Sequence, residues 1–286
     1  MKSAGDIKKI GVAGAGLMGS QIALNAAMSG YSVWLYDSFP SAVDKAKDWS
    51  EKYLADRVAK GKLERAKVTE TLARFHLSKE LAEAVGDADL VIEAIIEKQD
   101  VKEKFFRELD KLVAPDAIIA TNSSFMVSSL FAGCVSNPRR LANLHYFNPA
   151  LTMKLVEIVK GPHTADETAR TLFDFVKSVN KVPVIIKKEV DGFIVNRIAR
   201  AISNAALEII ELGVADPEDV DTAIENGLNH PMGPFRLMDL TGIDLTYYIA
   251  TDAVNNGQTV PAYKILREKF EAGELGRKTG KGWYDY

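Results

Sequence analysis

The hydrophobic pattern of the chain changes near residue 190. Before that point, short apolar runs alternate with stretches in which apolar residues recur at every third or fourth position. This alternation is typical of a doubly wound α/β fold, in which helices cover both faces of a mostly parallel sheet. We expect strands at 8–14, 31–37, 88–95, 116–122, 140–147, 154–161 and 182–188, and helices at 17–30, 41–60, 64–75, 100–113 and 165–180.

From residue 191 to the end the pattern is helical. The stretch "AISNAALEII" carries more apolar residues than one core-facing stripe requires, and "ADPEDVDTAIENG" contains Asp216 as an N-cap followed by Pro217. The tail "GRKTGKGWYDY" is too rich in glycine and lysine for a helix. The sequence therefore predicts two domains, 1–190 and 191–286, and the second is all-helical. Its surplus apolar surface predicts a homodimer.

A glycine motif follows the first predicted strand. Gly14, Gly16 and Gly19 in "GAGLMG" have the G-x-G-x-x-G spacing at the start of a helix. In this context the first glycine permits a tight turn, the second lets a pyrophosphate approach the backbone, and the third lets helix and sheet pack closely. Leu17 and Met18 are the first residues of the predicted helix, and the free backbone amides at this N-terminus are expected to face the phosphates. The motif predicts a Rossmann-like dinucleotide-binding domain.

An acidic residue, Asp37, ends the second predicted strand. A carboxylate at this position accepts hydrogen bonds from the adenosine ribose hydroxyls and repels a 2′-phosphate. The alternative is an ordinary strand-end aspartate beside a glycine turn. The context of the motif favours the first interpretation, so the predicted cofactor is NAD rather than NADP.

Composition narrows the classes of function. The formal net charge of -3 provides no overall basic field for nucleic acid. No apolar stretch reaches the roughly 18 residues of a membrane-spanning helix, and the first residues contain no apolar signal segment. The single cysteine, Cys134, is expected to be a buried thiol in a cytoplasmic protein. His76, His163 and His230 have no acidic or sulfur neighbours at ligand spacing, so we predict no metal site.

A histidine and a glutamate occur near the ends of two successive predicted strands. His145 lies in "RLANLHYF" and Glu157 in "KLVEIVKG". A histidine at a strand end is often structural. An imidazole can also transfer a proton at neutral pH, and a carboxylate on its other nitrogen then fixes the tautomer. From the residues alone, both interpretations stay open.

Several stretches, distributed from end to end, resemble the 3-hydroxyacyl-CoA dehydrogenase family, especially its short bacterial 3-hydroxybutyryl-CoA dehydrogenase form. They are "GAGLMG", "DLVIEAIIEKQDVK", "HYFNP", "MKLVEIVKG", "GFIVNR", "HPMGPF" and "GRKTGKGWYDY". The resemblance implies oxidation of the 3-hydroxyl group of an (S)-3-hydroxyacyl thioester of coenzyme A with NAD. It also implies a dinucleotide domain joined to a helical domain that binds substrate and forms a dimer.

The resemblance implies four catalytic residues. His145 matches the family's acid/base, and Glu157 matches the glutamate that orients it. Ser124 matches the serine that donates a hydrogen bond to the substrate oxygen, because its distance from the histidine fits better than that of Ser123. Asn196 matches the asparagine that holds the substrate oxygens. The structural alternatives are a helix-capping role for Ser124 and a domain-interface hydrogen bond for Asn196.

Three further residues are expected at the cofactor. By the same match, Glu97 and Lys102 contact the nicotinamide ribose and neighbouring groups, and Asn122 belongs to the same segment as the catalytic serine. The alternative for Glu97 and Lys102 is the solvated N-terminus of a helix, where acids and lysines are common.

A charged helical hairpin is expected at the coenzyme A. Lys60 matches the family lysine that meets the nucleotide end of coenzyme A, and Arg57 and Lys62 add positive charge for its phosphates. A lysine-rich helix face is also commonly just solvated. Trp49 and Tyr53 on the same hairpin either contact an adenine or, more often for such residues, pack against neighbouring apolar side chains.

Three positions depart from the family pattern. Phe125 stands where a second serine is usual, and Leu151 and Asp191 stand where prolines are usual. None of them changes the proton-transfer chemistry, but Phe125 and Leu151 put the acyl-chain preference in doubt. Asp191 is a candidate N-cap for a helix that begins at Phe193.

Two other functions compete with the thioester dehydrogenase. One is a dehydrogenase of a free 3-hydroxy acid, of the gulonate or carnitine type, which has no need of Lys60. The other is a non-catalytic NAD(H)-binding sensor or structural protein, which has no need of an acid/base pair at His145 and Glu157.

Overall fold

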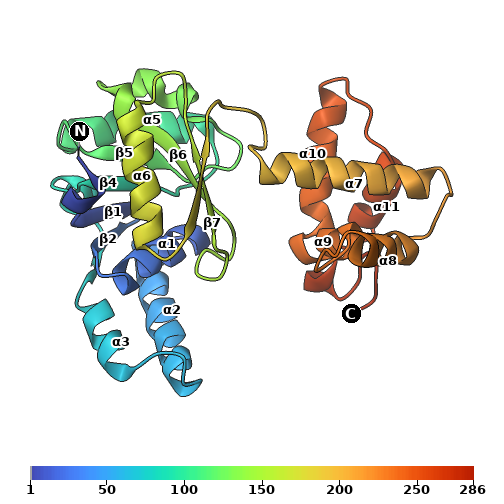
Figure 1. The fold of residues 1–286 in the computed structure, drawn as a ribbon, viewed down its shortest axis with the longest axis horizontal. Helices are drawn as coiled ribbons and strands as arrows, with labels where there is room; N and C mark the ends of the chain where they lie inside the picture. Colours follow the sequence, from blue (N-terminus) through green and yellow to red (C-terminus); the bar gives the residue numbers. More distant parts are fainter. Residues whose placement is uncertain (1) are drawn as a thin grey trace. The chain divides into compact units, whose positions relative to one another are not determined.

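The computed structural model describes residues 2–286. The contacts within the chain divide it into two compact units, of which the first ends at Phe193 and the second begins at Ile194 (Figure 1). Each unit is described by itself.

Within residues 2–193 the first unit contains one eight-stranded sheet with the order β3-β2-β1-β4-β5-β6-β7-β8. All neighbouring pairs are parallel except β6 and β7, which are antiparallel. This confirms the predicted Rossmann-like, mostly parallel sheet. The strands are β1 (Lys9–Ala13), β2 (Ser32–Tyr36), β3 (Phe75–Ser78), β4 (Leu90–Glu93), β5 (Ile118–Thr121), β6 (Leu141–Tyr146), β7 (Leu155–Val159) and β8 (Val182–Ile186).

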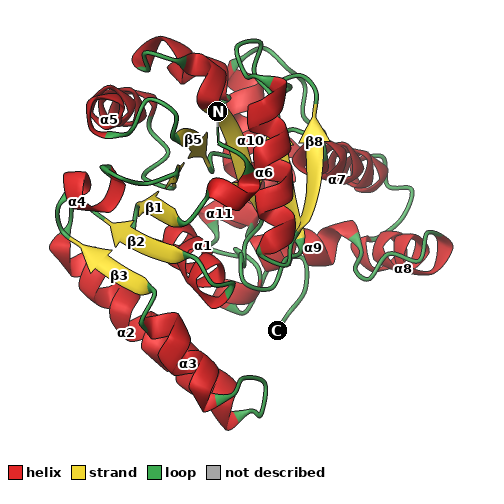
Figure 2. Ribbon diagram, turned by 60° about the vertical axis from the view of Figure 1, so that its left-hand side comes forward, coloured by secondary structure: helices red, strands yellow, loops and turns green. Residues whose placement is uncertain are grey.

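Helices cover both faces of this sheet. They are α1 (Leu17–Met28), α2 (Pro40–Ala59), α3 (Arg65–Leu72), α4 (Leu81–Val85), α5 (Gln99–Leu112) and α6 (Asp166–Ser178), with short 3₁₀ helices at Ala4–Asp6, Ser128–Cys134 and Pro138–Arg140. Residues of α1 and α6 pack with one face of the sheet, and residues of α4 and α5 pack with the other. Helices α2 and α3 form a hairpin beside β3 (Figure 2).

Alternation along the strands explains the two cores. In β6, Ala142 and Leu144 face the core that contains α1 and α6, whereas Leu141 faces the core that contains α4 and α5. Successive side chains of a strand point to opposite faces, so Asn143 and His145 lie on the same face as Leu141. Two polar side chains of β6 therefore point toward the α4 and α5 side.

The second unit consists of helices in the residues that the structure describes there. They are α7 (Val195–Glu211), α8 (Pro217–Gly227), α9 (Pro234–Thr241), α10 (Ile243–Asn255) and α11 (Tyr263–Glu271), with a short 3₁₀ helix at Arg277–Thr279. Their apolar side chains share a core that includes Leu207, Phe235 and Leu266. The predicted all-helical C-terminal part is confirmed.

The tail after α11 folds around one buried carboxylate. Asp239 accepts hydrogen bonds from the backbone amides of Trp283 at 2.9 Å and Tyr284 at 3.0 Å. A Cβ at Gly282 would collide with this carboxylate, so only glycine fits there. The tail is therefore ordered without being a regular α-helix. Across the described residues, no helix combines the length and apolar character that crossing a membrane requires.

Candidate active site

The candidate site lies where several strands end on the same side of the sheet. β1 lies between β2 and β4, so the chain connections leave β1 and β4 in opposite directions along the sheet. Ligands of open α/β sheets bind beyond the carboxyl ends of the strands at such a reversal. The glycine motif follows β1, and Glu93, Thr121 and His145 lie at or near the carboxyl ends of β4, β5 and β6.

The glycine turn leaves space where a phosphate would bind. Gly14 has a φ of 103° and lies against the backbone of Ala94, so a side chain has no room there. A Cβ at Gly19 would collide with the carbonyl oxygen of Gly14, so this glycine lets α1 approach the turn. At Gly16, the N-cap residue of α1, a Cβ would meet no atom within 4 Å. The N-terminal amides of α1 can therefore be approached by an anion.

The first two residues of α1 differ in their surroundings. Leu17 is 61% exposed, whereas Met18 packs partly against the core.

Asp37 follows β2 and is half-buried. Its two carboxylate oxygens accept hydrogen bonds from the amides of Ala15 at 2.8 Å and Phe39 at 2.9 Å. Each oxygen retains acceptor capacity, and the carboxylate lies directly beside the glycine turn.

His145 and Glu157 meet because of strand register. The two residues are directly opposite each other in the antiparallel pair of β6 and β7. Nδ1 of His145 lies 2.9 Å from Oε2 of Glu157, and both side chains are buried. The spacing between the two residues in the sequence is therefore the length of a β-hairpin that brings them face to face.

Ser124 lies at the other nitrogen of the same ring. Its Oγ is 2.9 Å from Nε2 of His145. Ser123 instead donates its hydroxyl proton to Glu97 and accepts a hydrogen bond from the amide of Met126 at 2.8 Å. Of these two adjacent serines, Ser123 stabilises the turn and Ser124 faces the histidine. The rings of Phe147 and Phe193 cover His145, with centroids 4.6 and 5.4 Å from the imidazole.

Lys102 is buried between two carboxylates. Its Nζ lies 2.5 Å from Glu93 and 3.1 Å from Glu97, and its side chain is only 1% exposed. This burial excludes the solvated-helix interpretation for Lys102, whereas the side chain of Glu97 is 39% exposed. Thr121 donates its hydroxyl proton to Glu93 at 2.6 Å. Burial raises the pKa of Glu93, and the ammonium of Lys102 opposes this shift.

Three polar residues of this edge, Glu93, Thr121 and Asn143, have no counterpart among the predicted site residues. Glu93 has a recognisable signal in the sequence, because it is a lone carboxylate that ends the apolar strand in "DLVIEA". Asn143 is fully buried in β6 and has no such signal in the sequence.

Asn122 accepts a hydrogen bond from the amide of Tyr146 at 2.9 Å, which ties the end of β5 to the residue after His145.

The residues expected at coenzyme A lie on the α2–α3 hairpin. Lys60 directly follows α2 and is exposed, as is Lys62, and Arg57 is half-buried. Trp49 and Tyr53 stack on each other with ring centroids 5.5 Å apart and pack against the core. Packing therefore accounts for these two aromatic residues.

The departures from the family pattern have different surroundings. Phe125, beside Ser124, is 47% exposed, whereas Leu151 packs against the core and its amide donates to Gln21 at 3.2 Å. The expected N-cap role of Asp191 is wrong, because α7 begins at Val195 with Ile194 at its N-cap position. Gly192 and Phe193 have φ values of 72° and 50°, which no helix start adopts.

Asn196 is the second residue of α7 and belongs to the second compact unit. Its position relative to the substrate stays a prediction. Among residues 2–286, no group of three histidine, cysteine or acidic side chains is arranged to hold a metal ion.

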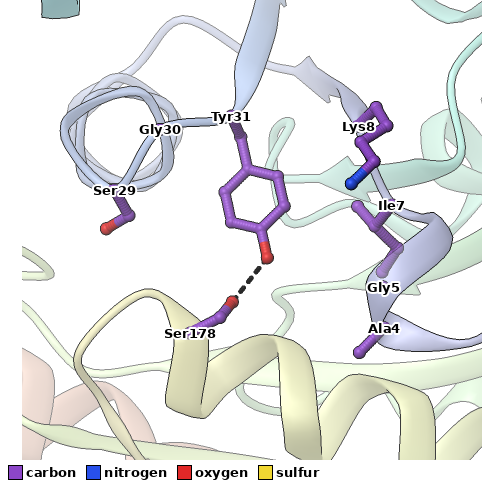
Figure 3. Close-up of a pocket in the computed structure, with 8 residues that line it drawn as sticks. All are labelled: Ala4, Gly5, Ile7, Lys8, Ser29, Gly30, Tyr31 and Ser178. Atoms are coloured by element: carbon purple, nitrogen blue, oxygen red, sulfur yellow. Dashed lines mark hydrogen bonds between the residues drawn. The ribbon is translucent and has the colours of Figure 1, made fainter.

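A hollow of about 370 Å³ lies at the amino ends of the strands, on the side of the sheet away from the glycine turn. It is lined by residues before β1, after α1 and at the end of α6, where the hydroxyls of Tyr31 and Ser178 lie 2.5 Å apart (Figure 3). None of the predicted site residues lines it. It is separate from the edge where the glycine turn and His145 lie.

The chain matches two parts of one protein family. Residues 9–190 match the NAD-binding domain of 3-hydroxyacyl-CoA dehydrogenase, and residues 192–286 match its C-terminal domain. A 3-hydroxybutyryl-CoA dehydrogenase of Clostridioides difficile is 40% identical over 280 residues, which cover 97% of this chain and 99% of the relative. A probable 3-hydroxybutyryl-CoA dehydrogenase of Deinococcus radiodurans is 38% identical over 281 residues, covering 97% of this chain and all of the relative.

Solved structures agree with these matches. The crystal structure of (S)-3-hydroxybutyryl-CoA dehydrogenase from Ralstonia eutropha superposes with a TM-score of 0.89 at 34% identity, covering 98% of this chain and 99% of the other. The NAD-binding domain confirms the predicted cofactor. The chain therefore belongs to the 3-hydroxyacyl-CoA dehydrogenase family of NAD-dependent oxidoreductases.

Proposed function

We propose that the protein interconverts (S)-3-hydroxybutyryl-CoA and acetoacetyl-CoA with NAD as the redox partner. The observation that carries the proposal is the hydrogen-bonded series Ser124–His145–Glu157, at the edge of the sheet where the glycine turn also lies. Relatives with this name align with nearly the whole chain and favour a short 3-hydroxyacyl thioester as substrate.

In this proposal His145 is the acid/base. When Nδ1–H donates to Glu157, the neutral ring presents its Nε2 lone pair to the substrate. During oxidation Nε2 takes the proton of the 3-hydroxyl as the hydrogen on C3 leaves with its electron pair, and Glu157 stabilises the resulting imidazolium. NAD, when bound, supplies the acceptor for that hydride. During reduction His145 returns the proton to the oxygen on C3.

Ser124 and Asn196 are proposed to hold the substrate oxygens. Because Ser124 Oγ is 2.9 Å from Nε2 of His145, an oxygen placed beside that nitrogen also lies within reach of the serine hydroxyl. A hydrogen bond from Ser124 keeps the C3 oxygen in place while the proton moves. Asn196, at the start of α7, adds its side-chain amide by the family match.

The cofactor and coenzyme A are assigned to different residues. We assign the nicotinamide side of NAD to Glu97, Lys102 and Asn122, and the adenosine side to Asp37. The exposed Lys60 is assigned to the nucleotide end of coenzyme A. Phe125, which is half-exposed and next to Ser124 in the sequence, is assigned to limiting the length of the acyl chain.

We assign substrate binding and homodimer formation to the helical domain, for which the sequence predicts the limits 191–286, and we assign the protein to the cytoplasm. The helices of this domain expose large apolar side chains, including Ile198 at 55%, Leu240 at 50% and Tyr248 at 58%. Covering such side chains favours self-association. We expect sedimentation at micromolar concentration to give twice the monomer mass, and a monomer alone contradicts the assignment.

One assay separates the proposal from its rivals. The purified protein is incubated with NADH and either acetoacetyl-CoA or free acetoacetate, and oxidation of NADH is followed by absorbance. We expect rapid turnover of the thioester only. Turnover of the free acid alone indicates a dehydrogenase of free 3-hydroxy acids. NADH binding without turnover of either compound indicates a sensor or structural protein.

A further inference from the structure

Three buried polar residues form a row across neighbouring strands. Glu93 of β4 is directly opposite Thr121 of β5, and Thr121 is opposite Asn143 of β6. All three are fully buried. Glu93 accepts hydrogen bonds from both Thr121 and Lys102, whereas Asn143 binds the backbone of the segment that carries Ser124.

Asn143 holds the turn of residues 122–128 on both sides of Ser124. Its Nδ2 donates to the carbonyl oxygens of Ser123 at 3.3 Å and Met126 at 2.9 Å. Its Oδ1 accepts a hydrogen bond from the backbone amide of Ser128 at 2.8 Å. Ser128 is the first residue of the 3₁₀ helix Ser128–Cys134, so this bond gives the first amide of that helix a partner. A side-chain amide has two donor hydrogens and an acceptor oxygen, so Asn143 uses both kinds of group on one turn.

The position of Asn143 links this turn to the proton-transfer histidine. Asn143 and His145 are two residues apart on β6 and point to the same face. The carbonyl group of Ser123, which Asn143 binds, forms the peptide bond to Ser124 itself. The turn and the imidazole are therefore both fixed to the same short strand.

We propose that Asn143 is a positioning residue that sets the 2.9 Å separation between Ser124 Oγ and His145 Nε2. The inference rests on the proposed roles of His145 and Ser124. Both polar groups of the Asn143 side chain bind the backbone of the turn, so we assign it a positioning role rather than a catalytic one. It acts on the reaction through Ser124, because its hydrogen bonds are to the backbone of that turn.

Other anchors keep the turn folded when Asn143 is replaced. Glu189 accepts hydrogen bonds from the hydroxyl of Ser128 at 3.0 Å and the amide of Ser129 at 2.9 Å. Ser123 accepts from the amide of Met126. Loss of Asn143 should therefore displace Ser124 rather than unfold the segment, and a displacement of about 1 Å can cost on the order of 100-fold in rate.

The test compares Asn143→Ala and the isosteric Asn143→Asp with a matched control. Thr164 lies between β7 and α6, and its buried hydroxyl donates a hydrogen bond at 2.7 Å to the carbonyl oxygen of Leu141, the first residue of β6. Thr164→Val removes this hydrogen bond and is the control. We expect both Asn143 variants to lower kcat for acetoacetyl-CoA reduction by about 10- to 100-fold, with the Kd for NADH changed less than about twofold. Thr164→Val should lower stability but leave kcat within about threefold. Equal kcat losses in the Asn143 variants and the control overturn the proposal.

A double-mutant cycle with Ser124→Ala decides whether Asn143 acts through the serine. In the Ser124→Ala background, Asn143→Ala should lower kcat by no more than about threefold. The inference is overturned if the kcat losses of the two single variants multiply in the double variant. It is also overturned if Ser124→Ala leaves kcat unchanged while Asn143→Ala lowers it. If Asn143→Ala does not fold, Asn143→Asp is used in the same cycle. A failure of the proposed function is detected separately with His145→Gln. If His145 is not the acid/base, this variant keeps the wild-type kcat.

Discussion

Two buried clusters at the carboxyl edge of the sheet use their charged groups differently. The histidine cluster consists of Ser124, His145 and Glu157, and the lysine cluster consists of Lys102 with Glu93, Glu97 and Thr121. In the histidine cluster an imidazole lies between two hydrogen-bonding partners, the hydroxyl of Ser124 and the carboxylate of Glu157. In the lysine cluster the buried side chain of Lys102 lies between the carboxyl groups of Glu93 and Glu97. The first arrangement suits proton transfer, and the second holds neighbouring elements in place.

The geometry of each cluster follows from a different kind of contact. His145 and Glu157 face each other across two antiparallel strands. Lys102 lies in the first turn of α5 and reaches back to Glu93 at the end of β4. Substitutions in the histidine cluster should therefore change turnover, and substitutions in the lysine cluster should change stability and cofactor affinity.

The largest expected effect is on turnover in the histidine cluster. His145→Gln keeps a hydrogen-bonding side chain but cannot act as acid or base, so we expect kcat to fall by about 10²- to 10⁴-fold. Glu157→Gln keeps the shape and removes the negative charge, so we expect a comparable loss. NADH oxidation with acetoacetyl-CoA measures kcat, and fluorescence titration should show nearly unchanged NADH affinity.

The double variant tests whether these two residues act together. Without His145 there is nothing for Glu157 to orient, so the combined loss should be smaller than the product of the single losses. A double variant that is slower by the full product indicates independent roles. The same result would remove the contrast between the two clusters, although not the assignment to the dehydrogenase family.

In the lysine cluster we expect a loss of stability. Glu93→Gln replaces one of the two buried oxygens that accept hydrogen bonds from Lys102 and Thr121 with an NH2 group, so one buried hydrogen bond is lost and the free energy of unfolding should fall by about 1–3 kcal/mol. The Kd for NADH should rise because Lys102 and Glu97 are no longer held in place, while kcat at saturating NADH stays within a few-fold. Urea unfolding and NADH titration measure the two effects.

A second substitution provides the control. Glu93→Gln combined with Lys102→Met leaves no unpaired ammonium, so part of the lost stability should return although NADH affinity should not. If Glu93→Gln alone leaves stability unchanged but lowers kcat by 100-fold or so, Glu93 belongs functionally with the histidine cluster instead.

A smaller effect is expected on the pH dependence of stability. Burial raises the pKa of Glu93, and Lys102 opposes the shift. A carboxyl group with a raised pKa in the folded state binds its proton more tightly there than in the unfolded chain. Its contribution to stability is fully present below the unfolded pKa of about 4.3, and it is lost as the pH rises through the folded pKa. Glu93→Gln should therefore flatten the decline in unfolding free energy above about pH 4.3. If the free energies of unfolding of the variant and the wild type differ by the same amount at every pH, this prediction is contradicted.

Much of the fold could be predicted from the sequence because its elements have strong periodic patterns. Seven strands, β1, β2 and β4 to β8, each lie within a predicted apolar run. The strand β3 and helix α4 were missed. β3 has only four residues, "FHLS", and two of them are polar, so its pattern is too short to distinguish from a turn. Its place in the sheet is given by pairing with β2.

The candidate site could be predicted only in part. The glycine motif is local in sequence, and the family match adds Ser124, His145 and Glu157. Glu93 and Asn143 were missed because their partners come from other elements, through strand register and the first turn of α5. The pattern of a strand shows which residues are buried, but it does not show which backbone groups a buried amide will meet.

The smallest expected effect concerns Asp37, which belongs to neither cluster. Its carboxylate lies beside the glycine turn, where it accepts hydrogen bonds from the amides of Ala15 and Phe39. We expect kcat/KM for NADH to exceed that for NADPH by at least about tenfold, or roughly 1.4 kcal/mol, because the charge repels a 2′-phosphate. Asp37→Ser should reduce this preference, and Asp37→Asn should do so while keeping an oxygen for the amide of Ala15. If only the serine variant loses the preference, anchoring of the turn rather than charge is responsible. Since neither cluster contains Asp37, kcat with saturating NADH should stay near the wild-type value in both variants, and equal use of both cofactors by the unmodified protein refutes the role of Asp37.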